Sequence, residues 1–94
     1  MLCGASLADV FLLARYVMSF DQRERRARCV ELFDCSEEAA FYVALTGRAH
    51  ALYGDGSLSA LALRKPLASM PATLSVEMLS ALQLVIEQLR ARSN

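Results

Sequence analysis

The residue with the clearest chemical potential is His50, the one histidine in the chain. Arg48, Tyr53 and Asp55 lie close to it in the sequence, and side chains of these types could form an acid–base site. A histidine near a helix end more often hydrogen-bonds backbone carbonyls or interacts with the negative end of the helix dipole. Because the sequence offers no nucleophile–base pair to accompany His50, we expect a protein that is not an enzyme and uses no cofactor.

Cysteines are the next candidates for chemistry, and the chain has three, Cys3, Cys29 and Cys35. They are odd in number and lack the CxxC spacing of a metal site, and only one histidine, His50, is present to join them in a zinc site, which needs about four ligands. We therefore predict free or buried thiols and no metal. Unpaired thiols in so small a domain are typical of the reducing cytosol, which favours a cytoplasmic protein.

The apolar stretch from Met1 to Val17 could be a signal peptide or a membrane span. It has no basic start, and Asp9 and Arg15 interrupt it well short of the ~20 residues that cross a bilayer. The sequence therefore predicts neither of these segments.

Four arginines form the basic cluster of the chain: Arg23, Arg25, Arg26 and Arg28. They divide between two nearly opposite sides of a helix, so at most two or three of them could contact the phosphates of one duplex. These four residues are the predicted DNA-binding set. The alternative is a solvated helix face, on which Glu24 and Glu31 form ion pairs with Arg28 that contribute about 0.2–0.5 kcal/mol each.

The charge of the whole chain limits what this cluster can do. Ten Lys and Arg balance ten Asp and Glu, so the net charge is zero, whereas tight DNA binding usually requires a basic excess. A helix that begins with Glu37 and Glu38 would repel phosphate where a helix-turn-helix protein reads bases. We therefore expect any contact with DNA to be weak and independent of sequence.

Composition and periodicity predict the elements that position these residues. The chain of 94 residues has room for one domain, and it contains 16 Leu and 15 Ala but only four Gly and two Pro, which favours helix over strand. We predict an all-α fold, a single small domain over residues 1–94 with four to five helices. Their expected ranges are about 7–18, 22–34, 37–49, 58–64 and 74–91.

Capping residues mark where these helices begin. Ser6 with Asp9 forms a capping box before the first helix, Ser36 precedes the third, and Ser57 precedes the fourth. The turn Gly54-Asp55-Gly56 is the strongest break in the helical pattern, and it lacks the glycine spacing and the lysine of a phosphate loop. We interpret it as a tight turn that leads into a helix cap.

The last predicted helix opens at Thr73 or Ser75 and is long and apolar around most of its circumference. A surface helix of a monomer has an apolar face little more than about 100° wide, so we expect this helix to be buried between the subunits of a homo-oligomer. The predicted oligomerisation residues are Met78, Leu79, Leu82, Val85, Ile86 and Leu89. The alternative is a central helix that the other four enclose within one chain.

Two segments and the last helix resemble a known family. The segments are Thr46-Gly47-Arg48-Ala49-His50 and Tyr53-Gly54-Asp55-Gly56-Ser57-Leu58, followed by Arg64, Pro66 and a helix with Leu82, Val85 and Leu89. They are similar to a small family encoded in alphaproteobacterial gene transfer agents, whose role is like that of phage small terminase subunits. The resemblance spans about residues 9–92.

The resemblance implies a function as well as a family. Such proteins are non-catalytic oligomers that bind double-stranded DNA and present it to the ATP-driven large terminase, which would be the protein partner. Phage small terminases usually carry an N-terminal helix-turn-helix, from which this chain departs because its reading helix would be acidic. The competing hypothesis is a helical protein–protein adaptor or regulatory factor with no direct contact with DNA.

Overall fold

The first helix, α1 (Leu7–Met18), is determined by local sequence at both of its ends. In the computed structural model, which describes residues 6–55, 57–64, 66–69 and 74–92, the Ser6 hydroxyl accepts a hydrogen bond from the Asp9 amide at 3.2 Å. The Asp9 carboxylate in turn accepts one from the Ser6 amide at 3.0 Å, which completes the expected capping box. The Ser19 hydroxyl donates to the Tyr16 carbonyl at 2.6 Å, where the helix ends. The predicted range of this helix is confirmed.

The second helix, α2 (Arg25–Thr46), corrects the prediction of two helices at 22–34 and 37–49. The expected break before Ser36 is absent, and Ser36 lies buried inside one continuous helix of 22 residues. Buried residues continue on the same side of the helix past this point, from Cys29 to Ala39. No Gly or Pro interrupts the backbone there, so burial of a continuous stripe outweighs the preference of serine for a helix start.

Gly47 ends α2 earlier than the predicted position 49. Its φ of 70° is left-handed, and its amide donates to the Val43 carbonyl at 2.8 Å. A residue with a Cβ pays roughly 1 kcal/mol or more to adopt this conformation, which glycine adopts freely. The glycine therefore turns the chain out of the helix.

The third helix, α3 (Leu58–Ala62), begins at the predicted cap. The Ser57 hydroxyl accepts a hydrogen bond from the Ala60 amide at 3.3 Å. The helix is shorter than the predicted range of 58–64, because Leu63 already forms its C-terminal cap, ahead of Pro66.

The fourth helix, α4 (Val76–Arg92), closely follows the predicted range of 74–91. The Ser75 hydroxyl accepts a hydrogen bond from the Met78 amide at 3.1 Å, which makes Ser75 the cap. Thr73, the other candidate cap, lies outside the described residues. Acidic Glu77 in the first turn and two arginines in the last turn favour the helix dipole.

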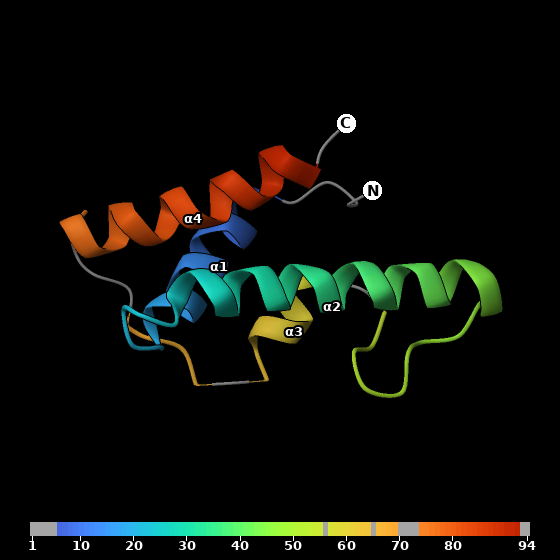
Figure 1. Ribbon diagram of the computed structural model, residues 1–94. Coiled ribbons are helices and arrows are strands. Elements are labelled where there is room, and N and C mark those ends of the chain that lie inside the picture. Colours follow the sequence, from blue (N-terminus) through green and yellow to red (C-terminus); the bar gives the residue numbers. More distant parts are fainter. Residues whose placement is uncertain (1–5, 56, 65, 70–73, 93–94) are drawn as a thin grey trace.

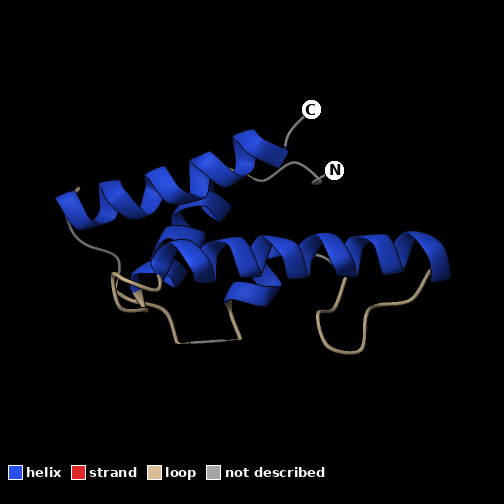
Figure 2. Ribbon diagram, viewed as in Figure 1, coloured by secondary structure: helices blue, strands red, loops and turns tan. Residues whose placement is uncertain are grey.

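The other three helices pack around α1. Figure 1 shows α2 and α4 running along the length of the molecule, with α1 behind them and α3 against α2, and α1 contacts each of the other three helices. The C-terminal half of α2 extends past the rest of the bundle (Figure 1). Helices are the only regular structure of the described residues (Figure 2), which confirms the all-α fold of a single small domain.

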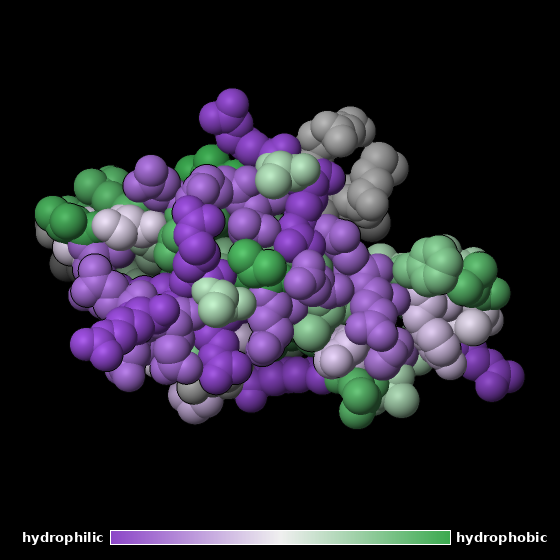
Figure 3. Space-filling view, in the orientation of Figure 1, coloured by the Kyte–Doolittle hydropathy of each residue, from purple (hydrophilic) through white to green (hydrophobic). Residues whose placement is uncertain are grey.

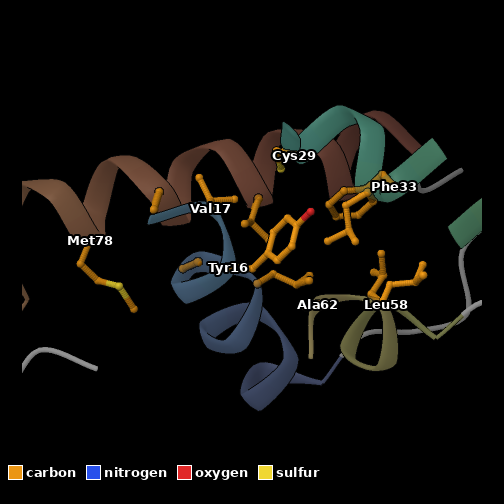
Figure 4. Close-up of a cluster of buried hydrophobic side chains, with 13 residues drawn as sticks. Tyr16, Val17, Cys29, Phe33, Leu58, Ala62 and Met78 are labelled. Carbon is orange, nitrogen blue, oxygen red and sulfur yellow. The ribbon is translucent and has the colours of Figure 1, made fainter. Parts of the chain in front are cut away.

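The hydrophobic core takes side chains from all four helices (Figure 4). Phe33 of α2, Leu13 of α1 and Met78 of α4 are its largest fully buried members. The core residues are Leu13, Ala14, Tyr16, Val17, Cys29, Leu32, Phe33, Leu58, Leu61, Ala62, Met78, Ala81 and Val85.

A charged contact at the edge of this core joins α4 to α2. Arg92 forms ion pairs with Asp34 at 2.8 Å and with Glu37 at 2.7 Å. Its guanidinium also lies 5.5 Å from the centre of the Phe33 ring. Glu37, which the sequence places at the start of a helix, is therefore a mid-helix residue that fixes the end of α4.

Candidate functional site

Arg25, a member of the predicted DNA-binding set, is part of the fold. Its side chain is only 15% exposed, and it forms an ion pair with Glu77 at 2.7 Å. Its Nε donates to the Phe20 carbonyl at 3.0 Å, and a second nitrogen reaches the Met18 carbonyl at 3.4 Å. Because the guanidinium joins the end of α1 to the start of α4, it is not free to bind phosphate as the sequence predicts.

The next two arginines of the set are exposed but paired. Arg26 reaches across to α4 and forms an ion pair with Glu87 at 3.0 Å. Arg28 forms the two predicted pairs along its own helix, with Glu24 at 3.3 Å and with Glu31 at 3.4 Å. The chain's own carboxylates therefore neutralise much of the basic cluster.

Arg23 differs from its three neighbours. It is exposed in the turn before α2, and it is the member of the cluster that forms no ion pair with another described residue. The sequence treats the four arginines as one set, whereas the fold separates one anchored residue, two paired residues and one unpaired residue.

A shallow groove of about 660 Å³ follows the outer side of α2 and its preceding turn. Basic side chains line one end of it and acidic side chains line the other, with the smaller Ala27 and Val30 between them. The lining residues are Arg23, Arg26, Ala27, Val30, Glu31, Asp34, Cys35 and Glu38. The sequence does not predict that both signs share one face, because the expected break before Ser36 divides this segment into two helices.

The loop between α2 and α3 carries most of the residues on which the family resemblance depends. His50 and Gly54 exchange backbone hydrogen bonds at 2.7 and 3.0 Å, and Gly54 has a φ of 72°. The guanidinium of Arg64 donates to the Leu52 carbonyl. The Asp55 carboxylate accepts a hydrogen bond from the Ser57 amide at 2.9 Å. These contacts give the motif a structural role as a tight loop that leads into a cap.

His50 supports this loop from within. Its Nδ1 accepts hydrogen bonds from the Leu52 amide at 3.0 Å and from the Tyr53 amide at 3.2 Å. Its ring stacks on Tyr53 with centroids 4.7 Å apart and meets the edge of Tyr42 at 5.1 Å. The Nδ1 atom is therefore engaged by the backbone of its own loop, which gives His50 a structural role.

The cysteines are thiols, as predicted, where the structure describes them. Cys29 is buried in the core, and burial raises the pKa of its thiol to about 11. Cys35 is half-buried and hydrogen-bonds to Tyr53, which raises the pKa of that phenol. Cys3 lies outside the described residues. No group of three or more potential metal ligands forms among the residues whose placement is described.

The predicted oligomerisation residues of α4 fall into three groups. Met78 and Val85 are fully buried in the core of a single chain, so they cannot contact another subunit in this fold. Leu82 and Leu89 are half-buried and pack against the same core. Only Leu79 and Ile86 face outward, with about half of each side chain exposed.

Exposed apolar side chains also gather at the far end of α2, which the sequence analysis does not single out. Phe41 and Leu45 are 66% and 70% exposed, and Leu52 of the following loop is 63% exposed. Phe41 and Leu45 are four residues apart on the helix, and this spacing is the signal that could have identified them. Figure 3 shows hydrophobic surface over the end of α2 and again over the start of α4, at opposite ends of a largely polar face.

Comparisons with known proteins identify a family without a defined function. Residues 5–89 match the family described as a domain of unknown function (DUF7742), and the chain belongs to that family. No curated protein and no solved structure matches the chain. None of the described helices is both long enough and apolar enough to cross a membrane.

Proposed function

We propose that this member of the DUF7742 family is a non-catalytic, small-terminase-like component of a DNA-packaging apparatus. It assembles into a homo-oligomer in the cytoplasm, binds double-stranded DNA weakly and without sequence preference, and presents the DNA to the large terminase motor. The assignment to DNA packaging is based on the resemblance to gene transfer agent proteins. The observation that carries the proposal is the apolar surface that one chain leaves exposed.

This apolar surface lies at both ends of the molecule. Phe41 and Leu45 at the end of α2, and Val76 and Leu79 at the start of α4, are each at least half exposed. Large exposed apolar side chains that gather in patches are typical of surfaces that other proteins cover. They support assembly, even though the most deeply buried positions of α4 belong to the core.

Contact with DNA depends on the arginines that remain at the surface. Arg26 and Arg28 form exposed ion pairs, which contribute little to stability, and each arginine can exchange a carboxylate for a phosphate. A single chain then supplies few phosphate contacts. An oligomer multiplies them through effective concentration, so weak contacts suffice.

The test is duplex binding at low salt, measured by fluorescence anisotropy with two duplexes of unrelated sequence. The double substitution Arg26→Gln and Arg28→Gln removes two positive charges. It should weaken binding about equally for both duplexes and reduce the salt dependence of binding. Arg90→Gln, an exposed position at the end of α4, is the control. Binding that the double substitution leaves unchanged would remove these arginines from the proposal.

A second candidate is the helical adaptor that does not contact DNA. The pairing of Arg25, Arg26 and Arg28 with glutamates of the same chain specifically favours it, because little positive charge is left for phosphate. A stable complex with the large terminase, together with no shift of any duplex at low salt, would support the adaptor.

A further inference from the structure

We propose that two copies of the chain pair in antiparallel orientation along the outer face of α2, the face that carries the groove between Arg23 and Glu38. The inference names the surface by which the chain meets a second copy. It therefore rests on the assembly contained in the proposed function, and it is independent of DNA binding.

The charges of this face complement themselves. Arg23 and Arg26 lie at its N-terminal end, and Asp34 and Glu38 lie at its C-terminal end. Arg23 and Glu38 are equally far, in opposite directions, from the point between Val30 and Glu31. A twofold axis at that point places Arg23 opposite Glu38 of the partner subunit, and the symmetry forms this ion pair twice.

The two residues of this pair are available for it. Arg23 is exposed, and among the described residues neither Arg23 nor Glu38 forms an ion pair within its own chain. A parallel arrangement of two copies would instead place arginines beside arginines and carboxylates beside carboxylates. The charge pattern therefore selects the antiparallel orientation.

Shape and apolar surface favour the same arrangement. Ala27 and Val30 line the middle of the groove and are small beside the long side chains at its ends, and small residues at a contact let helix axes approach to about 8–10 Å. An antiparallel pair also brings the exposed Phe41 and Leu45 of one copy alongside the end of the other at which α4 begins. The apolar side chains at the end of α2 and at the start of α4 are exposed in a single chain.

The experiment is a charge exchange on the full chain, with the mass measured by sedimentation equilibrium at low salt and without DNA. Arg23→Glu alone and Glu38→Arg alone each replace two attractions with two repulsions, and each should weaken self-association by about tenfold or more. An equimolar mixture of the two variants should recover it, because the mixed dimer contains one ion pair of the original sign and one of reversed sign, and both attract. The double variant should recover it as well.

Arg90→Glu changes the net charge as Arg23→Glu does, lies on α4 away from this face, and should leave the association unchanged. Circular dichroism of each variant confirms that it has folded. If the single charge reversals leave the mass of the assembly unchanged, or if the mixture does not restore the assembly, this interface is wrong. Either result leaves the assembly in the proposed function intact. A wild-type chain that stays monomeric overturns both.

Discussion

Arg23 and Arg25 stand two positions apart in the sequence, yet their guanidinium groups have different surroundings. Arg23 projects from a turn into solvent. Arg25 donates to the Phe20 carbonyl and to the carboxylate of Glu77 on another helix. Arg25 lies in the first turn of α2, within reach of the end of α1 and of Glu77 on α4, whereas Arg23 lies in the turn before the helix. Only Arg25 of the two therefore has a structural role.

Arg25→Ala should therefore destabilise the fold. The substitution removes the ion pair with Glu77 and leaves the Phe20 carbonyl without this donor, and a hydrogen bond to a charged group contributes about 1.5–3 kcal/mol. We expect the free energy of unfolding in urea, followed by circular dichroism, to fall by about this amount. Arg48→Ala, at an exposed position, should change it by less than about 0.5 kcal/mol. Equal effects of the two substitutions would contradict the anchoring role.

Because Cys29 is buried, we expect the free energy of unfolding to depend on pH in the alkaline range. Burial raises the pKa of its thiol from 9.0 to about 11. Below pH 9 the thiol is protonated in both the folded and the unfolded chain. Between pH 9 and 11 it ionises only in the unfolded chain, so the free energy of unfolding should fall by about 2–3 kcal/mol across this window.

The measurement is urea unfolding at a series of pH values for the wild type and for Cys29→Ala. The variant is less stable at every pH because it leaves a small cavity, so the slope against pH is the quantity to compare. Its slope should be shallower but not flat, since burial also raises the pKa of Tyr16. Equal slopes for the two proteins would exclude Cys29 as the source.

At the scale of elements, the loop between α2 and α3 joins two helices by means of unusual backbone conformations. Gly47 and Gly54 have φ values of 70° and 72°. His50 then holds the loop through two backbone amides and the stacked Tyr53. The residues that most resemble a family motif are therefore the ones that the turn itself requires.

Gly47→Ala should destabilise the end of α2 by about 1 kcal/mol. A Cβ at this position meets no other atom within 4 Å, so the cost comes from the left-handed backbone and not from a clash. Thermal unfolding measures it. Gly47→Asn should cost less, because asparagine tolerates this conformation better than alanine does. If the two variants were equally unstable, backbone strain would not be the cause.

At the scale of the whole molecule, α4 has two different sides. Met78, Ala81 and Val85 are buried against the other helices, and Leu79 and Ile86 are about half exposed. The helix is thus an ordinary core helix on one side. On the other side Leu79 and Ile86 remain partly exposed among the described residues.

Met78→Ala and Leu79→Ala should separate these sides. At a protein concentration low enough to keep the chain monomeric, Met78→Ala should lower the free energy of unfolding by about 2–5 kcal/mol, and Leu79→Ala should change it little. At high concentration Leu79→Ala should also lose stability relative to the wild type, provided that assembly covers this side chain. Urea unfolding at two concentrations provides the comparison, and a large loss for Leu79→Ala in the monomer would contradict the division.

Much of the fold follows from local sequence, because its signals act within one turn of the chain. The capping box of Ser6 and Asp9, the serine caps of α3 and α4, and the helical class itself depend on side chains three or four residues apart. The one large error, a break before Ser36, arose because a good capping residue also fits inside a helix when its neighbours are buried. Burial of that kind depends on other helices, which local spacing does not contain.

The sequence by itself determined the fold class, most of the helix starts, the Arg28 ion pairs and the glycine turn. Only the tertiary structure decided which arginines are anchored, which apolar residues of α4 lie in the core, and that basic and acidic residues share one face of α2. The physical reason is distance along the chain. Arg25 and Glu77, or Arg26 and Glu87, meet only after the whole domain has folded, and their contacts set what remains exposed for a partner.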